Sequence, residues 1–452
     1  MSTPVSTAPP AAFGGSSISS PTLSMRKVIQ TWWPLAAGWL VMTIEIPLLA
    51  AFVARAADPK VHLAAWGMLF PIVLILASPV MMLLAASTTL CKDWQAFTTV
   101  RRYMYIIAAG LTALHALLAF TPLFELVVVD FIAPPAEIVE PVRMGLRAML
   151  PWSFCLGFRR FNYGILIRAG HTQVVTMGAV TRVCGTLLMA LLLFMLDGIP
   201  GALIAAGGIV FGVITEAVYA GIQTRPVLRN ELRHAPRLAE PLTLPIFRAF
   251  YLPLVMTSLL QIAVQPVVTA ALSRMPQPLD SLATWPVLYG LIIIFMSVSM
   301  ASIEAIVVLL DEPGAPATLR RFMTRLAITM CSLLIVLNAT PLAELWFTNI
   351  SALPTALVHP AHMALWLALP IPALAAFEAL FQGTLMHRRR TRGITEAVLL
   401  GLTLIGCVLV VGVLWGEIPG IYVGMVALSL AYVGRASWLW RRASILNRIA
   451  HG

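Results

Sequence analysis

Long apolar runs dominate the chain and recur along almost its whole length. The runs are continuous and do not alternate between apolar and polar residues, so they predict helices and argue against a membrane β-barrel. A helix that crosses a bilayer needs about 20 predominantly apolar residues. This length predicts twelve membrane helices, at roughly 28–54, 62–90, 103–129, 142–167, 174–196, 199–223, 244–272, 282–309, 321–346, 358–386, 395–415 and 418–440.

Composition supports the same fold class. Of the 452 residues, 60% are hydrophobic and 11% are charged, which is more apolar surface than a soluble chain of this length can bury. We therefore expect an all-α polytopic membrane protein. Residues 1–24 carry no charge and no run long enough to cross a bilayer, so they are predicted to form a disordered tail and not a signal peptide.

The chain also repeats itself. "TPLFEL" at 121–126 returns as "TPLAEL" at 340–345, which is a shift of 340 − 121 = 219 residues. The same shift superimposes eight of the eleven prolines between 34 and 201 on prolines of the second half. These are Pro34, Pro47, Pro59, Pro122, Pro135, Pro141, Pro151 and Pro200, which fall on Pro253, Pro266, Pro278, Pro341, Pro354, Pro360, Pro370 and Pro419.

This register predicts a tandem duplication of a six-helix unit. The halves are 25–223 and 244–442, joined by a hydrophilic cytoplasmic linker at 224–243 and followed by a short tail at 443–452. Because each unit crosses the membrane an even number of times, the halves are related by a pseudo-two-fold axis along the membrane normal. That architecture is typical of alternating-access carriers, whose substrate sites lie near the midplane between the halves.

The net charge of +11 is explained by membrane topology. Basic residues gather at both chain ends and in the even-numbered loops, for example at Arg225, Arg229 and Arg233. The odd-numbered loops offer little beyond Arg55, Lys60 and Arg274. This asymmetry places both termini in the cytoplasm and argues against a nucleic-acid partner. The 27 arginines against three lysines fit a GC-rich bacterial genome, and hence a bacterial inner membrane.

Charged residues inside membrane segments are costly, so they are candidates for function. The fourth segment is the most basic, and Arg147, Arg159 and Arg160, with the neighbouring Asn162, are predicted to bind substrate. A guanidinium near the midplane can hold a carboxylate or phosphate with two hydrogen bonds. The alternative is that these arginines reach the inner interface or pair with an acid on another helix.

Four acids lie within the predicted membrane helices. Glu45 is either a proton-coupling site or the partner of an arginine such as Arg159, and we favour the pairing because both groups are costly alone. Glu304 is a second coupling candidate. Glu378 replaces Arg159 in the second half, so it is included in the predicted substrate site. The fourth acid is Glu216.

The first helix of each half adds polar and kinked positions. Gln261 and Gln265 are predicted to line the cavity, with hydrogen bonding between helices as the alternative. Pro47 and Pro266 each remove a backbone hydrogen bond near mid-helix. They are hinge candidates, and the alternative is a fixed kink kept for packing.

The six-plus-six arrangement resembles the multidrug/oligosaccharidyl-lipid/polysaccharide (MOP) exporter superfamily, with an architecture like that of its MATE transporters. The segments "QPVVTAALSR" (265–274), "IEAIVVLLDE" (303–312) and "FNYGILIRAGHT" (161–172) look most like the progressive ankylosis (ANK) family within it. That resemblance implies export of small polyanions such as citrate, pyrophosphate or nucleotide-like phosphates. The major facilitator superfamily shares the layout, but its signature is missing from "CKDWQAFTTVRR" (91–102).

The remaining chemistry is sparse. No CxxC pair, phosphate-binding loop or nucleophile motif occurs, so no catalytic residue, metal site or cofactor is predicted and an enzyme is not expected. We expect a monomer that meets a small anionic substrate, membrane lipid and a coupling proton or sodium ion. A flippase for a lipid-linked glycan, a cation-coupled multidrug antiporter, and a channel or scaffold stay open as alternatives.

Overall fold

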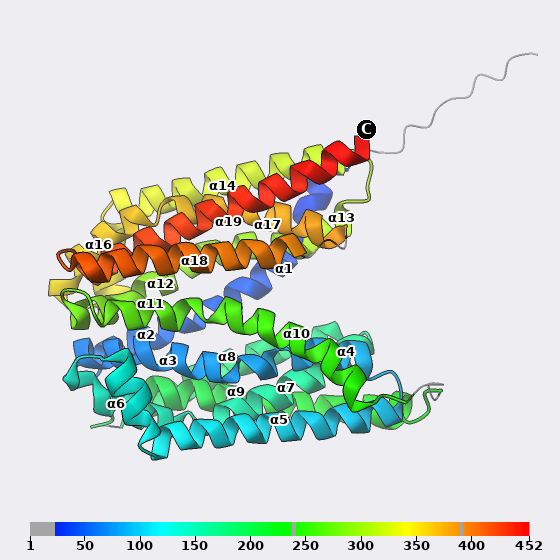
Figure 1. Ribbon diagram of the computed structural model, residues 1–452, viewed down its shortest axis with the longest axis horizontal. Helices are drawn as coiled ribbons and strands as arrows, with labels where there is room; N and C mark the ends of the chain where they lie inside the picture. The colour runs from blue at the N-terminus through cyan, green and yellow to red at the C-terminus, as the bar shows by residue number, and fades with distance from the viewer. Residues whose placement is uncertain (1–22, 197, 237–240, 389, 391, 452) are drawn as a thin grey trace, which may run out of the picture.

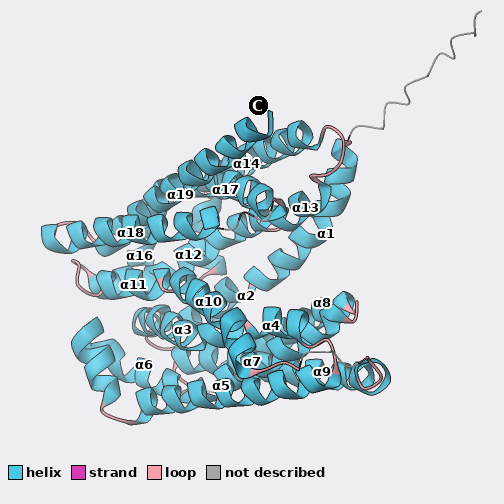
Figure 2. Cartoon of the chain, turned by 45° about the vertical axis from the view of Figure 1, so that its right-hand side comes forward, coloured by secondary structure: helices cyan, strands magenta, loops and turns pink. Residues whose placement is uncertain are grey.

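The computed structural model describes residues 23–451 except 197, 237–240, 389 and 391, and in these ranges the chain is helical with no strand (Figure 2). The predicted tail 1–24 therefore lies almost entirely outside the described residues. The helices of the first half are α1 (Met25–Thr43), α2 (Glu45–Arg55), α3 (Pro59–Met81), α4 (Leu83–Leu90), α5 (Trp94–Phe120), η1 (Glu125–Ile132), α6 (Ala136–Ala148), α7 (Leu150–Arg168), α8 (Thr172–Phe194), α9 (Gly201–Val227) and η2 (Leu228–Leu232).

The second half repeats this order. Its helices are α10 (Leu244–Ile262), α11 (Val264–Leu272), α12 (Pro278–Met300), α13 (Ser302–Leu309), α14 (Ala315–Ala339), α15 (Leu342–Leu345), η3 (Trp346–Ile350), α16 (Thr355–Leu367), α17 (Pro370–His387), α18 (Arg392–Trp415) and α19 (Gly420–His451). Helix continues beyond the predicted end of the first half at 223, and α19 continues beyond the predicted boundary at 442.

The described residues contain ten helical spans long and apolar enough to cross a membrane. The helices α16 and α17 pass the same test only together, with a bend of 42° between them, and add an eleventh span if the pair is counted as one. The one predicted segment left over is the fourth, the arginine-rich segment 142–167. It corresponds to the second half of α6 and most of α7. The chain is thus a multi-pass membrane protein of the predicted all-α class.

Several helices break at equivalent places in the two halves. The first helix of each half is interrupted at Ile44 and Ala263, which are 219 residues apart. Pro47 and Pro266 follow these breaks by three residues, where a proline cannot donate to the carbonyl four residues earlier. The predicted kinks are therefore present, and each kink divides its helix into two segments that pack differently.

The two halves form two lobes, and the first segment of each half crosses to the opposite lobe (Figure 1). Helix α1 packs mainly on α12 and α13 of the second half, whereas α2 packs on α9 and α3 of its own half. Conversely, α10 packs mainly on α3 of the first half. Because of the kinks at Ile44 and Ala263, the first helix of each half can pack against both lobes.

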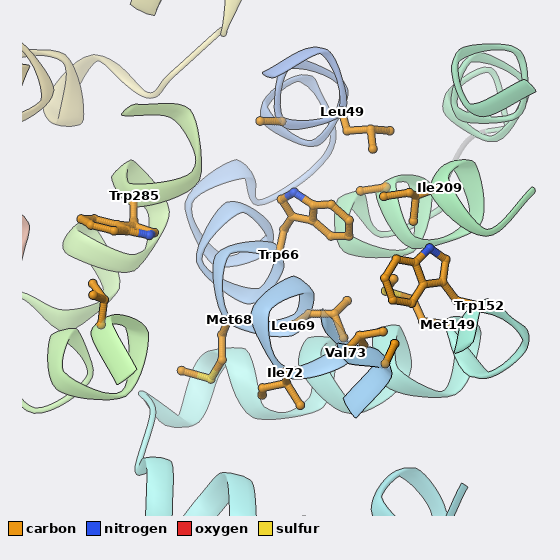
Figure 3. Packing of buried hydrophobic residues seen from close by; sticks show 14 of the residues in the cluster. Leu49, Trp66, Met68, Leu69, Ile72, Val73, Met149, Trp152, Ile209 and Trp285 are labelled. Atoms are coloured by element: carbon orange, nitrogen blue, oxygen red, sulfur yellow. The ribbon is translucent and has the colours of Figure 1, made fainter. Parts of the chain in front are cut away.

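The lobes meet closely along α3 and α12. A Cβ on Gly67 would lie 2.8 Å from the carbonyl oxygen of Leu282, so only glycine permits this approach. Trp66 and its equivalent Trp285 are both buried near this contact (Figure 3). In Figure 3 Trp66 packs among Leu49 and Ile209 of its own lobe, which ties α3 to α2 and α9.

Candidate substrate and coupling site

A network of four buried charges lies inside the first lobe. Glu45 at the start of α2 forms an ion pair with Arg182 of α8, and Arg159 of α7 forms one with Glu216 of α9. The Nε atom of Arg182 also lies 3.3 Å from Oε2 of Glu216, which links the two pairs. All four side chains are at most 11% exposed.

Neutral donors complete this network. The hydroxyl of Thr186 donates to Oε1 of Glu45 over 2.6 Å, and the hydroxyl of Tyr163 donates to Oε1 of Glu216 over 2.9 Å. The favoured pairing of Glu45 with an arginine is therefore present, but its partner is Arg182 and not Arg159. Both carboxylates are matched by a guanidinium, as buried charges require.

Arg160 differs from these arginines. Within the described residues no carboxylate lies within salt-bridge distance of Arg160, and its one polar contact is with the sulfur of Met81, at 3.7 Å. Its Nε atom is buried without a hydrogen-bond partner. Met81 ends α3 at the break before α4, so Arg160 lies beside an irregular point of the second helix. It is a partly exposed cation with unused donors.

The second lobe contains the equivalent ion pair with its charges exchanged. Glu378 of α17 lies at the position of Arg159, and Arg435 of α19 lies at that of Glu216, since 378 − 159 and 435 − 216 both equal 219. Glu378 and Arg435 form an ion pair. The Nε2 atom of Gln382 donates to Glu378 over 2.6 Å, and Gln382 is in turn equivalent to Tyr163.

The other two charges of the first lobe have no counterpart in the second. The positions of Glu45 and Arg182 are taken by Val264 and Gly401. A cavity of ≈ 340 Å³ is present here, and both residues line it together with Glu378 and Arg435. The predicted pair Gln261 and Gln265 also lines this cavity. Gln265 accepts a hydrogen bond from the indole of Trp285 over 3.1 Å, which holds α11 against α12.

The other predicted residues lie outside these groups. Arg147 is exposed near the end of α6, where its Nε atom donates to the carbonyl of Ala119, and it does not join Arg159. Asn162 is buried but donates to the carbonyl of Phe158 in its own helix, over 2.8 Å. Glu304 is exposed on α13 and hydrogen-bonds with Trp39 of α1, so it contacts the crossing helix.

Reciprocal contacts close the end of the lobes where α2 and α11 finish. Arg55 at the end of α2 donates to the carbonyl of Ile350 over 2.9 Å, and Arg274 just after α11 donates to the carbonyl of Phe131. Arg55 and Arg274 are equivalent residues, and so are Phe131 and Ile350. The same contact is therefore made twice, each time from one half to the other. Lys60 and Asp280 add an ion pair across the lobes.

A second reciprocal pair ties the crossing helices to the opposite lobes. The Nε1 atom of Trp32 on α1 donates to the carbonyl of Val298 over 3.1 Å. The hydroxyl of Tyr251 on α10 donates to the carbonyl of Pro79 over 2.7 Å. Trp32 and Tyr251 are equivalent, and so are Pro79 and Val298. These carbonyls lie near the breaks that follow α3 and α12.

Sequence reasoning missed Arg182, Arg435 and the role of Glu216. Arg182 and Arg435 are single charges within predicted membrane helices, which is the signal that marked the other candidates. Applying the 219-residue register to Glu216 also points to Arg435, and hence to an exchanged ion pair. Among the residues that the structure describes, no group of three or more His, Cys, Asp or Glu side chains could hold a metal ion.

Comparison with known proteins identifies the fold. No protein-family model matches the sequence, and a search of curated proteins finds no match. Among solved structures, an inward-facing multidrug resistance MATE family transporter of the MOP superfamily is 13% identical, with a TM-score of 0.70 over 91% of this chain and 99% of that chain. The lipid II flippase MurJ in an inward closed conformation is 12% identical, with a TM-score of 0.67 over 91% and 87%.

A third solved structure has the same fold. A MOP superfamily transporter from Pyrococcus furiosus, described as having a binding pocket of reverse polarity, is 16% identical, with a TM-score of 0.59 over 94% of this chain and 96% of that chain. None of these comparisons tests the ANK-family resemblance, which stays a prediction. The agreement in helix order and arrangement over almost the whole chain shows that this protein has the fold of the MOP superfamily of transporters.

Proposed function

We propose that the chain is an alternating-access transporter captured with its outer side closed, and that it exports small organic or phosphate-containing anions. The observation that carries the proposal is the reciprocal closure by Arg55 and Arg274. Equivalent residues make the same contact in both directions, so a rocking motion of the lobes breaks or forms both contacts together. Both contacts run from one half to the other, so they hold the lobes together at this end.

Similarity to solved structures supports the inward-facing assignment. The inward-facing MATE transporter superimposes with a TM-score of 0.70, whereas an outward-facing MATE transporter reaches 0.57. The contacts that would hold an inward-facing state are those at the outer end. In an inward-facing state, the ion pair of Lys60 and Asp280 strengthens the closure made by Arg55 and Arg274.

The charge balance of the first lobe points to the substrate class. Arg159 and Arg182 are neutralised by Glu45 and Glu216, so these four groups together carry no net charge. Arg160 remains without a carboxylate among the described residues and keeps free donors. A guanidinium of this kind binds a carboxylate or phosphate strongly in a site of low polarity. We assign Arg160 as the anchor for the anionic group.

The pair of Glu45 and Arg182 fits a coupling role. If Glu45 takes up a proton, Arg182 loses its main partner and is left with Glu216, from which its Nε atom is already 3.3 Å away. That change would release α2 from α8 and allow the kink at Ile44 to move. Proton uptake and helix bending would then be one event. A sodium ion would need oxygen ligands, which Glu45 and Thr186 also offer.

Transport by purified protein in vesicles tests this proposal. Vesicles loaded with radiolabelled citrate or pyrophosphate should release it faster with the parent protein than with empty membranes. Arg160→Gln should raise the KM for the anion by about tenfold or more, because an ionic contact is lost. Arg160→Lys should retain part of the affinity, and Arg147→Gln, which changes an exposed arginine, should behave like the parent. Equal release by Arg160→Gln and parent protein would rule out the anchor.

An apolar crevice favours a second candidate, flipping of a lipid-linked substrate. It has a volume of ≈ 610 Å³ and lies between the lobes, lined by apolar residues of α3, η1, α11 and α18 and by Arg274. Such a crevice can hold an acyl or polyprenyl chain beside the lobe interface. Accessibility of a labelled lipid-linked diphosphate on the two faces of the vesicle distinguishes this activity from release of a soluble anion.

The setting of the transporter is part of the proposal. We infer a monomer in a bacterial inner membrane. Both termini are assigned to the cytoplasm, because the basic residues gather at the two chain ends and in the even-numbered loops. The division into halves at 25–223 and 244–442, with 224–243 as a linker, is also kept as a proposal. Protease or tag accessibility in oriented vesicles tests the position of the termini.

A further inference from the structure

A cavity of ≈ 740 Å³ lies in the second lobe, and Glu378 and Arg435 are not among its lining residues. Its base is α17, and its two sides are α14 and residues 440–444 of α19. The base is apolar and includes Phe377, Leu380 and Phe381. The indole of Trp440 on α19 is 60% exposed beside it. This combination of an apolar base and an exposed indole is typical of a helix bundle at the edge of a membrane.

The mouth of this groove is strongly basic. Arg320 and Arg388 line it, and Arg321 and Arg325 follow Arg320 on α14, where with Arg320 they line an adjoining pocket. Within the described part of the chain, none of these four guanidinium groups has an ion pair or a hydrogen bond. The nearby acid Asp311 lies 3.0 Å from His387, so it already has a partner. The groove thus joins an apolar base to unpaired positive charge.

We propose that this groove binds an anionic phospholipid, with its phosphate at Arg320 and Arg388 and one acyl chain along Phe377 and Phe381. Basic pockets between membrane helices on the cytoplasmic side bind anionic headgroups for the same physical reason. A soluble anion would gain nothing from the apolar base, whereas an acyl chain excludes water from it. The charge and the apolar surface together therefore favour a lipid.

The equivalent surface of the first lobe does not offer this site. Trp440 and Arg388 correspond to Gly221 and Ala169, and Phe381 corresponds to Asn162. A Cβ on Gly221 would lie 3.0 Å from the ring of Phe158, so that ring packs directly against α9. Arg101 and Arg102 are the equivalents of Arg320 and Arg321. They share the charge, but the residues equivalent to Phe381, Arg388 and Trp440 differ, which makes them a matched control.

Counting bound lipids on the purified full chain by native mass spectrometry tests the proposal. The protein is titrated with phosphatidylglycerol or with phosphatidylcholine. The parent should retain phosphatidylglycerol preferentially, and Arg320→Gln/Arg388→Gln should weaken this retention by roughly fivefold for each arginine. Phe381→Asn should weaken retention of both lipids. Arg101→Gln/Arg102→Gln should match the parent.

Three results would overturn the proposal. The first is equal retention of the two lipids by the parent, and the second is an equal loss in the Arg101/Arg102 variant, which would indicate diffuse attraction to basic surface. The third is displacement of the lipid by inorganic phosphate alone. Because the readout is binding and not transport, it does not depend on the proposed function. Thermal unfolding of each variant shows that the comparison concerns folded protein.

Discussion

Arg159 and Glu216 form a buried ion pair between α7 and α9, and the second half contains the same pair with the charges exchanged, as Glu378 and Arg435. Removing one member of a buried pair leaves an uncompensated charge, at a cost of about 3–5 kcal/mol. The sign of the charge at one position can therefore change only if the sign at its partner changes as well. The exchange puts a cation on α7 and an anion at the equivalent position of α17, while each lobe keeps a neutral pair.

Replacing Glu216 should destabilise the protein strongly. Glu216→Gln removes the partner of Arg159 and the weaker partner of Arg182, while both side chains stay buried. We expect a loss of about 3–5 kcal/mol in the free energy of unfolding and a clear drop in Tm. Thermal unfolding in mild detergent measures the change. An unaltered Tm would show that solvent or lipid reaches the pair.

The exchanged variant is the matched control for that experiment. Arg159→Glu/Glu216→Arg copies the arrangement of Glu378 and Arg435 and should recover part of the stability that either single substitution loses. Full recovery is not expected, because Arg182 would then face a second guanidinium at position 216 in place of a carboxylate. The double variant should therefore fall between the parent and the single variants. A double variant less stable than both single variants would contradict the assigned pairing.

Copying the uncharged positions of the second half tests the other pair. Glu45 and Arg182 correspond to Val264 and Gly401, so Glu45→Val/Arg182→Gly copies the second lobe. Each single variant leaves one buried charge without its main partner and should lose about 3–5 kcal/mol of stability. The double variant should lose less than the sum of the two, because no unpaired charge remains from this pair. Additive losses would show that Glu45 and Arg182 do not act on each other.

The outer closure should control the conformational equilibrium. Arg55→Gln and Arg274→Gln each remove a charged hydrogen bond between the lobes, worth about 1.5–3 kcal/mol before screening by solvent. The double variant should shift the population toward the outward-open state. Distances between spin labels placed on the loops after α2 and η3 measure that shift.

Arg143→Gln is the control for the outer closure. Arg143 lies at the same end of the molecule but pairs with Glu125 of its own half, over 2.7 Å. Its loss should leave the distance distribution unchanged. A shift in Arg143→Gln similar to that in the Arg55 and Arg274 variants would mean that charge at this end, and not contact between the lobes, sets the equilibrium.

The aromatic donors of the crossing helices should act as a second pair. Trp32→Phe and Tyr251→Phe keep an aromatic ring and remove the donor to the carbonyls of Val298 and Pro79. Each loss should cost about 1 kcal/mol. We expect both variants to change the transport rate in the same direction, since the contacts are equivalent. The transport rate is measured as the rate of substrate counterflow. Opposite effects of the two substitutions on this rate would contradict a shared role.

Much of the fold follows from the sequence alone. Continuous apolar runs of bilayer length are a local property, and the register of 219 residues can be read without any structure. The matched prolines Pro47 and Pro266 correctly located the breaks in the first helix of each half. The ends of α9 and α19 extend beyond their predicted boundaries, because a helix does not have to stop where its apolar run ends.

Only the tertiary structure decided which charges meet. The sequence marked Glu45 and Arg159 as costly residues in a membrane, but their partners Arg182 and Glu216 depend on the rotation and depth of α8 and α9, which no local pattern encodes. The crossing of α1 and α10 to the opposite lobes is likewise a matter of packing. Hydrophobic length determines which segments enter the membrane, whereas the pairing of buried charges is fixed only when the helices are packed together.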